Sequence, residues 1–279
     1  MRILLTGAGG QLGQAAQRVF TRHEIVARTH AELDASDLVA VREAIESTRA
    51  DCVLNAAGYT AVDAAESDAE GAFAGNAIAP RHLAIATAER GIPLVHLSSD
   101  YVFDGRAGRP YHEYDATHPL SVYGQSKLAG ELEVRTFNPR HWIVRSAWLY
   151  SAVGRNFALT MRGLASRGEV RVVADQFGSP TWVPHLAAAL EQLIDTAAYG
   201  TYHLVNAGVA SWYELARAIF RELGLKVNVR PIPTSAYPTA ATRPLFSALA
   251  SVQQPRITLP PWEEGVKEFA AAVGGDREA

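Results

Sequence analysis

A chain of 279 residues is long enough for one large α/β domain and a smaller lobe, and 48% apolar with 20% charged residues is typical of a folded globular protein. The net charge of −3 gives no basic footprint for nucleic acid, and no apolar run reaches the ~20 residues of a membrane span. The single cysteine, Cys52, rules out an internal disulfide framework and fits a reducing compartment, so we expect a cytoplasmic protein in which Cys52 packs in a strand.

The first residues predict a unit that binds a dinucleotide. The apolar run 2–6 is typical of a buried parallel strand, and it leads directly into Gly7, Gly10 and Gly13 and then into a helical stretch over about 14–22. Glycines at this spacing permit a tight turn, let backbone amides approach a pyrophosphate and allow close strand–helix packing. The helix N-terminus then faces the phosphates with its partial positive charge. A glycine triplet alone is weak evidence, but a strand before it and a helix after it are the context that the motif requires.

The second predicted strand, 24–28, ends in Arg28. In dinucleotide folds an acidic residue at this position binds the ribose 2′-hydroxyl, whereas an arginine can pair with a 2′-phosphate. Arg28 therefore favours NADPH, with a solvated arginine at a strand end as the alternative interpretation. In the segment that follows, Ser36 or Asp37 can cap a helix that runs to about residue 49. Asp34 lies where a carboxylate could accept a hydrogen bond from the adenine amino group.

Two further strands bring small and hydroxyl-bearing residues to the same edge of the sheet. The third strand, within 51–58, ends in Ala56-Ala57-Gly58, whose small side chains leave room for a cofactor. The fourth strand, 92–97, delivers Ser98-Ser99-Asp100 at its carboxyl end. Ligands of open α/β sheets bind at that edge, so these residues are candidates for a site.

The helix that follows carries the residues with the clearest chemistry. Ser121 begins it, and Tyr123 and Lys127 lie four residues apart, so both project from one face. A free phenol titrates near ~10, and a neighbouring ammonium is expected to lower this pKa toward the working range. With the Ser99 hydroxyl beside the developing charge, this is a proton relay for reducing a ketone or oxidising an alcohol. A Tyr-x-x-x-Lys pair also occurs by chance in many helices, so its weight comes from the rest of the chain.

Strands and helices alternate through a fifth strand at 142–145, which predicts an α/β fold with a Rossmann-type doubly wound parallel sheet. We expect a dinucleotide-binding domain over 1–147 and a smaller C-terminal substrate-binding lobe over 148–279, with about 181–206 returning to the sheet. Aromatic- and proline-rich loops separate the short elements of the lobe, which include a helix that begins after Ser211.

Several short motifs together resemble one enzyme family. The chain resembles the extended short-chain dehydrogenase/reductases that act on nucleotide sugars in Gly7-x-x-Gly10-x-x-Gly13, Asn55-Ala56-Ala57, Ser99 and Tyr123-x-x-x-Lys127. More narrowly, it resembles the dTDP-4-dehydrorhamnose reductases over nearly its whole length. The stretches that carry this likeness are Gly10-Gln11-Leu12-Gly13, 61–66, 99–103, 119–124, 175–181 and 234–239. Each stretch is unspecific alone, but the set is highly specific.

The resemblance implies reduction of the C4 ketone of dTDP-4-dehydro-β-L-rhamnose by NADPH, with NADH as the other candidate cofactor. It makes Tyr123 the proton donor, Lys127 the residue that binds the nicotinamide ribose, and Ser99 a polarising hydroxyl where the family commonly has threonine. The cofactor-binding candidates, including those from the glycine loop and the second strand, are Gly7, Gly10, Gln11, Leu12, Gly13, Arg28, Asp34, Ala35, Ala57, Gly58, Tyr59, Thr60, Leu97, Tyr123 and Lys127. The substrate-binding candidates are Ser99, Asp100, Trp148, Asn156 and Arg243, with Arg145 as a further one. For Arg145, Asn156 and Arg243 a structural role is an equally good interpretation.

Two departures from the family pattern argue against a metal-bridged dimer and against dehydratase activity. Some members form a magnesium-bridged dimer through three glutamates, and the matching positions here are Ala15, Pro184 and Glu263. Because neither alanine nor proline can ligate a hard cation, we expect no metal site and a monomer or weak dimer. Nucleotide-sugar dehydratases have a glutamate after their Ser/Thr-Asp pair, and Tyr101 stands in that place here, so dehydration loses its base.

Three other interpretations stay open. Another nucleotide-sugar 4-reductase or a 4-epimerase would use the same Tyr123–Lys127 pair, although an epimerase recycles tightly held NAD whereas a reductase consumes added NADPH. The third is a non-catalytic dinucleotide-binding subunit, as in the regulatory β subunit of methionine adenosyltransferase. The retained hydroxyl, phenol and ammonium favour catalysis. Loops set the nucleotide base and the sugar stereochemistry, and a single sequence does not determine them.

Overall fold

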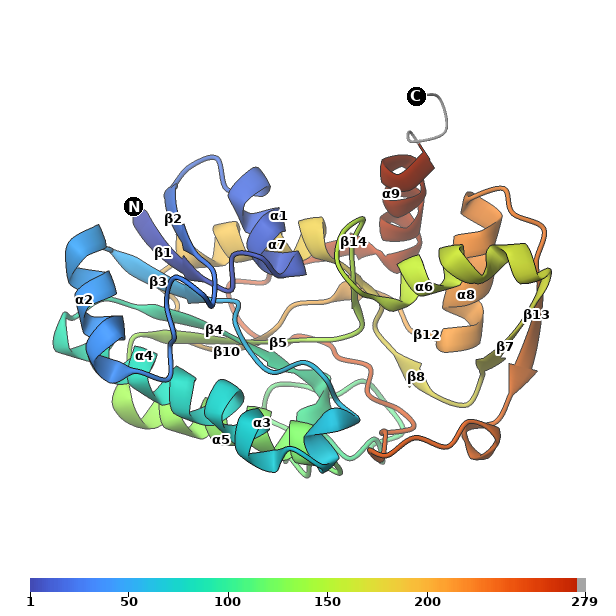
Figure 1. Ribbon diagram of the computed structural model, residues 1–279, viewed down its shortest axis with the longest axis horizontal. Helices are drawn as coiled ribbons and strands as arrows, with labels where there is room; N and C mark the ends of the chain where they lie inside the picture. Colours follow the sequence, from blue (N-terminus) through green and yellow to red (C-terminus); the bar gives the residue numbers. More distant parts are fainter. Residues whose placement is uncertain (275–279) are drawn as a thin grey trace.

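The computed structural model describes residues 1–274, and its centre is a six-stranded sheet in which every neighbouring pair is parallel. The strand order is β2-β1-β3-β4-β5-β10 (Figure 1). The strands are β1 (Arg2–Thr6), β2 (Glu24–Arg28), β3 (Cys52–Asn55), β4 (Leu94–Ser99), β5 (His141–Ser146) and β10 (Gly200–His203). The predicted fold class is confirmed. The order reverses between β1 and β3, which is where sheets of this kind form a ligand crevice.

Helices cover both faces of this sheet (Figure 1). On one face lie α1 (Gln11–Val19) and α7 (Val183–Ile194). On the other face lie α2 (Leu38–Thr48), α4 (Ala79–Glu89) and α5 (Val122–Phe137). The short helix α3 (Ala69–Phe73) continues through a π-helical turn, Ala74–Ile78, into α4. Among the described residues, no helix is both long and apolar enough to cross a membrane.

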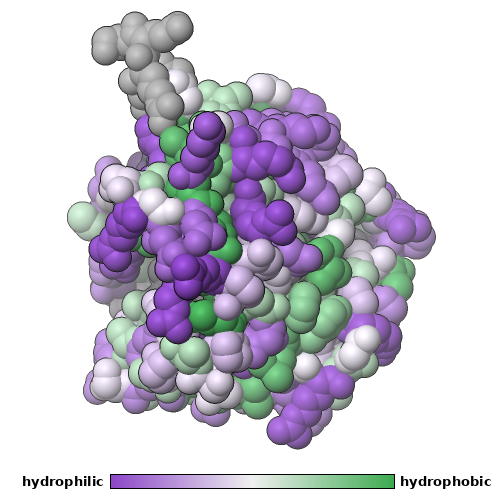
Figure 2. Space-filling view, turned by 90° about the vertical axis from the view of Figure 1, so that its right-hand side faces the viewer, coloured by the Kyte–Doolittle hydropathy of each residue, from purple (hydrophilic) through white to green (hydrophobic). Residues whose placement is uncertain are grey.

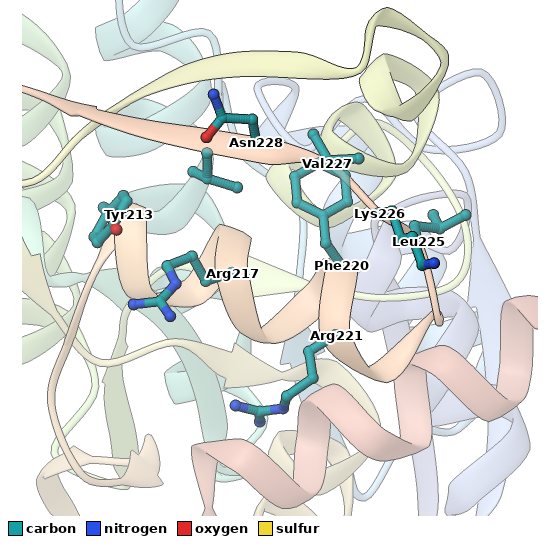
Figure 3. A pocket seen from close by; sticks show the side chains of 9 residues that line it. Tyr213, Arg217, Phe220, Arg221, Leu225, Lys226, Val227 and Asn228 are labelled. Atoms are coloured by element: carbon teal, nitrogen blue, oxygen red, sulfur yellow. The ribbon is translucent and has the colours of Figure 1, made fainter.

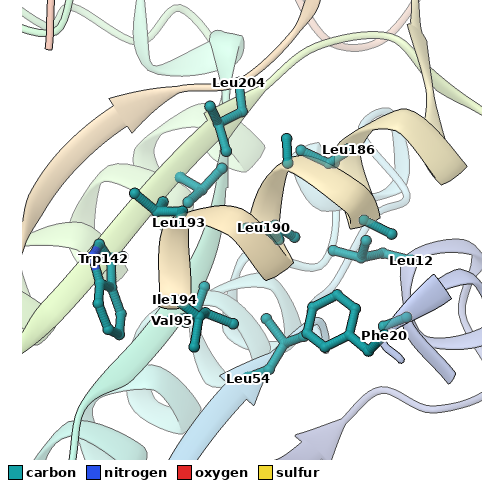
Figure 4. Packing of buried hydrophobic residues seen from close by; sticks show 14 of the residues in the cluster. Leu12, Phe20, Leu54, Val95, Trp142, Leu186, Leu190, Leu193, Ile194 and Leu204 are labelled. Atoms are coloured by element: carbon teal, nitrogen blue, oxygen red, sulfur yellow. The ribbon is translucent and has the colours of Figure 1, made fainter. Parts of the chain in front are cut away.

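Two apolar cores result because successive residues of a strand point to opposite faces. The core between the sheet, α1 and α7 contains Ile3 and Val144. It also contains Leu54 and Val95, which face Leu190 and Ile194 of α7 (Figure 4). The core under α2, α4 and α5 contains Leu4, Val53, Leu94 and Ile143. Cys52 lies fully buried in the first core, and burial raises the pKa of its thiol to about 12, so its prediction as a strand-packing residue is confirmed.

The helix starts follow the sequence signals, with one difference. Asp37 caps α2 and Ser121 caps α5, each by accepting hydrogen bonds from backbone amides of the first turn. α1 begins at Gln11, earlier than the expected residue 14, because Gly10 already takes the extended N-cap conformation. It ends at Val19 rather than near residue 22, since Phe20 leaves the helix and packs into the core.

The lobe that follows β5 consists of short elements (Figure 1). Its helices are α6 (Phe157–Leu164), α8 (Trp212–Glu222) and α9 (Trp262–Gly274). Its strands pair two by two: β6 (Leu149–Tyr150) with β9 (Thr181–Trp182), β7 (Glu169–Val173) with β13 (Asn228–Ile232), β8 (Phe177–Gly178) with β12 (Ala210–Ser211), and β11 (Asn206–Ala207) with β14 (Leu259–Pro261). α7 and β10 lie between these elements in the chain, yet they pack with the sheet.

Aromatic rings form the centre of the lobe's own core. Tyr150 and Trp182 come from the β6–β9 pair and Phe269 from α9, with ring centroids 5.5 to 6.1 Å apart. α8 packs against them and begins with the predicted cap at Ser211, which forms a reciprocal capping box with Glu214. The lobe is therefore held by contacts between elements that lie far apart in the chain.

Candidate active site

A cleft of about 460 Å³ opens at the carboxyl edge of the sheet, where the sheet meets the lobe. Its walls come from the ends of β3, β4 and β5, from α5 and from the first elements of the lobe. The predicted site residues that line it are Gln11, Ala57, Gly58, Tyr59, Thr60, Leu97, Ser99, Asp100, Tyr123, Lys127 and Trp148. Residues far apart in the sequence thus meet at the sheet edge where α/β folds place their ligands.

The glycine loop between β1 and α1 has the backbone shape of a phosphate cradle. Gly7 has a φ of +76°, which other residues rarely adopt, and a Cβ there would lie 2.6 Å from the amide nitrogen of Ala57. A Cβ on Gly13 would lie 2.2 Å from the carbonyl oxygen of Gly7, so α1 approaches the loop this closely only through a glycine. Gly10, which has no side chain, is the N-cap of α1. The first-turn amides of α1 are therefore available to an anion, and the loop fits a dinucleotide pyrophosphate.

Besides the three glycines of the loop, four predicted cofactor residues lie away from the lining of the cleft. Leu12 and Ala35 are buried in the two apolar cores. Arg28 is half-buried at the end of β2, where its Nη1 donates to the carbonyl oxygen of the preceding residue at 3.0 Å. Asp34 accepts hydrogen bonds from the hydroxyl and the amide of Ser36 at 2.7 and 2.9 Å, which hold its pKa below its usual range. Contacts of these four residues with a cofactor stay predictions.

The structure brings Tyr123, Lys127 and Ser99 together at the cleft. Lys127 is buried, and its Nζ donates to the carbonyl oxygen of Leu97 at 2.6 Å. The ring of Tyr123 lies edge-on to that of Tyr101, with centroids 5.4 Å apart. Ser99 Oγ accepts a hydrogen bond from the amide of Tyr101 at 3.1 Å and also contacts the Tyr123 phenol. Groups from α5 and from the end of β4 thus share one wall.

The electrostatics of this wall correct the expectation that Lys127 lowers the pKa of Tyr123. Burial raises the pKa of Tyr123 to about 12, the hydrogen bond with Ser99 opposes the rise, and the charge of Asp100 adds to it. The Lys127 ammonium is directed at a backbone carbonyl of β4 rather than at the phenol, which explains the difference. Burial also lowers the pKa of Lys127 to about 8, against the charge of Glu131. The phenol keeps its proton at neutral pH, as a proton donor must.

Asp100 lies buried behind Ser99, with both carboxylate oxygens engaged. Oδ1 accepts from Ser99 Oγ at 3.0 Å, and Oδ2 accepts from Ser247 Oγ at 2.5 Å. Burial raises the pKa of Asp100 to about 6, while the hydrogen bonds from Ser247 and Ser99 oppose the rise. The carboxylate orients the Ser99 hydroxyl and links it to the lobe. A direct contact between Asp100 and a sugar stays a prediction.

The lobe contributes an aromatic wall that the sequence analysis found only in part. The rings of Trp148 and Trp212 stack with centroids 3.5 Å apart, and the ring centroid of Phe157 lies 4.6 Å from that of Trp212. Trp148 has a φ of +48°, and its ring lies over Gly178, where a Cβ would come within 2.4 Å. Trp212, Phe157 and the exposed Arg155 also line the cleft and were not among the predicted residues. The 175–181 motif includes Gly178, but no sequence pattern predicts that Trp148 and Trp212 stack.

Three predicted substrate residues are engaged within the protein. Arg145 is buried and binds both carboxylate oxygens of Glu131 at 2.8 and 2.7 Å. Asn156 caps α6 with its side chain. Arg243 pairs with Asp63 through two hydrogen bonds of 3.0 and 2.7 Å. These contacts support the structural interpretation that the sequence left open for all three.

The positions that carry glutamates in metal-bridged dimers hold few possible ligands. Ala15 is buried in α1, Pro184 lies in the first turn of α7, and Glu263 lies in the first turn of α9. Over residues 1–274, no group of three or more His, Cys, Asp or Glu side chains could hold a metal ion. The monomer or weak dimer without a bridging metal stays a prediction.

A second hollow of about 470 Å³ lies on the outer surface of the lobe, between α8 and β13 (Figure 3). Arg217 lies over the ring of Tyr213 there, and Arg221 pairs with the neighbouring Glu222. Figure 2 shows this end of the molecule, where hydrophilic residues alternate with small apolar patches. The lining of this hollow has the phenol of Tyr213 but no serine or threonine hydroxyl, so the cleft is the candidate active site.

Known proteins are similar in sequence to this chain over nearly its whole length. The family profile described as the RmlD substrate binding domain matches residues 1–274. The dTDP-4-dehydrorhamnose reductase of Mycobacterium tuberculosis is 43% identical over 282 residues, which cover 98% of this chain and 92% of that protein. The dTDP-4-dehydrorhamnose reductase of Escherichia coli is 40% identical over 289 residues, which cover 96% of this chain and 97% of that protein.

Solved structures agree with this relationship. A dTDP-4-dehydrorhamnose reductase from Clostridium acetobutylicum has a TM-score of 0.94 at 39% identity, over 98% of this chain and 100% of that one. The dTDP-4-dehydrorhamnose reductase of Bacillus anthracis, solved in complex with NADP, has a TM-score of 0.94 at 38% identity, over 96% and 98%. The UDP-glucose 4-epimerase of Thermus thermophilus, 18% identical with a TM-score of 0.81, shares the fold. With its glycine loop, its tyrosine–lysine helix and these full-length relatives, the chain belongs to the RmlD substrate-binding-domain family.

Proposed function

We propose that this chain reduces the C4 ketone of dTDP-4-dehydro-β-L-rhamnose to dTDP-β-L-rhamnose, an activated sugar for cell-surface polysaccharide, with NADPH as reductant. The observation that carries the proposal is the meeting of Tyr123, Lys127 and Ser99 at one cleft beside the glycine loop. The names of the full-length relatives support the substrate, and the NADP in the Bacillus anthracis structure supports the cofactor. NADH is the other candidate reductant.

The crevice fits a nicotinamide dinucleotide. The first-turn amides of α1 would hold the pyrophosphate, because Gly7 and Gly13 have no side chains that block the approach to them. Ala57 and Gly58 leave space for the cofactor beside the end of β3. Arg28 at the end of β2 would pair with a 2′-phosphate and so favour NADPH over NADH. When bound, the nicotinamide supplies the hydride that goes to C4.

The chain's own side chains handle the proton and the charge on the ketone oxygen. Tyr123, kept protonated by its surroundings, gives its phenolic proton to that oxygen. Ser99 shares its hydroxyl proton with Asp100 and can turn it toward the same oxygen as negative charge develops there. Lys127, whose ammonium lies at the same wall of the cleft, would bind the nicotinamide ribose.

The lobe side of the cleft would hold the nucleotide sugar. The face formed by Trp148, Trp212 and Phe157 is rigid and apolar, which suits the planar base or the apolar face of a sugar ring. Arg155 at the exposed rim of the cleft supplies a positive charge for the diphosphate.

A coupled assay and one variant test the proposal. Purified protein is incubated with dTDP-4-dehydro-L-rhamnose and either NADPH or NADH, while nicotinamide absorbance and the sugar product are followed. Tyr123→Phe should lower kcat by about 10²–10⁴-fold with little change in cofactor Kd, because it removes only the proton donor. Tyr114→Phe, at a side chain that is 78% exposed, is the matched control.

Each alternative gives a different result in the same assay. Undiminished turnover in Tyr123→Phe would overturn the assignment of the proton donor. An epimerase would convert its sugar without net loss of NADPH, and a non-catalytic subunit would bind the dinucleotide without turnover. Either result would replace the reductase proposal.

We also propose a cytoplasmic protein that is a monomer or weak dimer and that does not bind nucleic acid. The buried, unpaired Cys52 supports a reducing compartment. Ala15 and Pro184, which cannot ligate magnesium, support an assembly without a bridging metal. Sedimentation that changes with magnesium or a chelator would contradict this.

A further inference from the structure

An acidic residue continues the face of α5 that carries the relay. Tyr123, Lys127 and Glu131 follow one another at intervals of four residues, so their side chains lie one above the next. Glu131 is 0% exposed. A carboxylate costs free energy in such a place unless partners compensate its charge, so its surroundings need an explanation.

Four hydrogen bonds hold the carboxylate of Glu131 in one position. Oε1 accepts from Ser98 Oγ at 2.6 Å and from Arg145 Nε at 2.8 Å. Oε2 accepts from Arg145 Nη2 at 2.7 Å and from Arg135 Nη2 at 2.9 Å. Burial works to raise the pKa of Glu131, but the hydrogen bonds and charge of Arg145 outweigh it and hold that pKa below its usual value. Glu131 is therefore an anion at every working pH.

Two successive residues of β4 receive the two charged side chains of α5. The carbonyl of Leu97 accepts from Lys127, and the hydroxyl of Ser98 donates to Glu131. The next residue along the strand is Ser99. The carboxylate thus fixes both the helix and the strand end that supply the relay.

We propose that Glu131 is a positioning residue of the reductase, whose buried negative charge keeps Lys127 cationic and holds the end of β4 beside it. The proposal rests on the function proposed above. Burial alone works against the ammonium of Lys127, and the charge of Glu131 opposes that effect. Without this charge, Lys127 would lose its proton at a lower pH.

The other titratable groups around Lys127 do not replace this charge. His96 on β4 is buried and uncharged, because burial holds its pKa well below its usual value. Arg145 on β5 is a cation turned toward Glu131, and Asp100 beyond β4 is bonded to two serine hydroxyls. The phenol of the relay keeps its proton. Glu131 is therefore the anion on which the charge of Lys127 depends.

The test compares two equivalent substitutions on the same helix. Glu131→Gln keeps the shape and removes the charge, whereas Glu133→Gln makes the same change at a partly exposed side chain that lies 3.8 Å from Arg81. The chain has three lysines, so ¹³C-labelled lysine gives three ε-carbon signals, which Lys226→Arg and Lys267→Arg assign. Their pH titration reports on Lys127 directly, without any need for turnover.

We expect Lys127 to titrate at least about one pH unit lower in Glu131→Gln than in the wild type, and to be unchanged in Glu133→Gln. The alkaline limb of kcat/KM should move by the same amount, whereas a merely structural defect would lower kcat/KM equally at all pH. An unmoved Lys127 titration in folded Glu131→Gln overturns the proposal even if the wild type is an active reductase. A wild type without turnover counts instead against the proposed function.

A second variant guards against a folding defect. Glu131→Gln leaves the buried guanidinium of Arg145 without its partner, so Glu131→Gln/Arg145→Gln removes both charges together. Lys127 should again titrate below the wild type, because the charge of Glu131 rather than that of Arg145 acts on it. A wild-type Lys127 titration in this double variant would overturn the proposal equally.

Discussion

The sheet domain and the lobe build the same cleft in different ways. The sheet domain reaches it with the ends of β3 and β4, which are neighbouring strands of one sheet, and with one face of the 16-residue helix α5. The lobe reaches it with Trp148, Phe157 and Trp212, which come from three segments that lie apart in the chain. Several lobe strands contain only two residues. The comparison teaches that the relay depends on locally encoded structure, whereas the substrate wall depends on contacts between distant segments.

The largest effect is expected in the sheet domain, at Gly13. In Gly13→Ala the new Cβ would meet the carbonyl oxygen of Gly7 at 2.2 Å and the Cα of Ala8 at 2.8 Å, and backbone atoms cannot move aside cheaply. We expect NADPH affinity to fall by about 10²-fold or more, with a loss of about 1–3 kcal/mol in the free energy of unfolding. Calorimetry with NADPH and urea unfolding measure the two effects. Gly9→Ala, where a Cβ meets nothing within 4 Å, is the control and should behave as the wild type.

The next largest effect is expected at Asp100, which joins the two regions through Ser99 and Ser247. Its pKa of about 6 in the folded state lies above its value of about 3.9 in the unfolded chain. Between these values the folded state binds more protons, so stability falls as pH rises through that window and stays lower above it. Asp100→Asn removes this loss and should be up to about 3 kcal/mol more stable than the wild type at neutral pH, at a cost in activity.

Urea unfolding of Asp100→Asn and the wild type at several pH values checks this prediction. The difference in unfolding free energy should be small at about pH 4 and should grow until about pH 6. A difference that is the same at every pH would show that the carboxylate does not titrate between the folded and unfolded states as expected. Ser247→Ala removes one hydrogen bond that opposes the rise in the pKa of Asp100, so its stability should keep falling with pH to a higher pH than that of the wild type.

The same comparison explains what could be predicted from the sequence. The buried strands appear as continuous apolar runs because both faces of a parallel sheet are covered, and Tyr123 and Lys127 share a face because helical spacing is fixed. These features are local. The contact of Trp148 with Trp212 and the pairing of Arg145 are not, because the partners come together only when several elements pack. Spacing could place Lys127 near Tyr123, but it could not show that the ammonium is directed at a β4 carbonyl.

A smaller effect is expected in the lobe, at Trp212. Trp212→Leu removes the ring that stacks on Trp148, so the substrate wall loses its support while the glycine loop is untouched. We expect KM for the nucleotide sugar to rise about tenfold, with NADPH affinity unchanged. Steady-state kinetics with each substrate varied in turn measures this. Tyr213→Leu, at the next residue of α8, lines the outer hollow instead and should leave both constants unchanged. If the affinities for the sugar and for NADPH fell equally, the lobe would not act on sugar binding alone, and this prediction would be wrong.

The smallest effects come from one substitution made in both regions. Ser211 caps α8 in the lobe and Ser121 caps α5 in the sheet domain, so each serine-to-alanine change should cost about 1 kcal/mol of unfolding free energy. Their kinetic effects should differ. Ser121→Ala loosens the turn that holds Tyr123 and should lower kcat, whereas Ser211→Ala loosens the turn that holds Trp212 and should raise only the KM for the sugar. Urea unfolding and steady-state kinetics of the pair separate these outcomes. If both variants lowered kcat alone, the lobe would contribute to the chemical step. Proton transfer would then not belong to the sheet domain alone, nor sugar binding to the lobe alone.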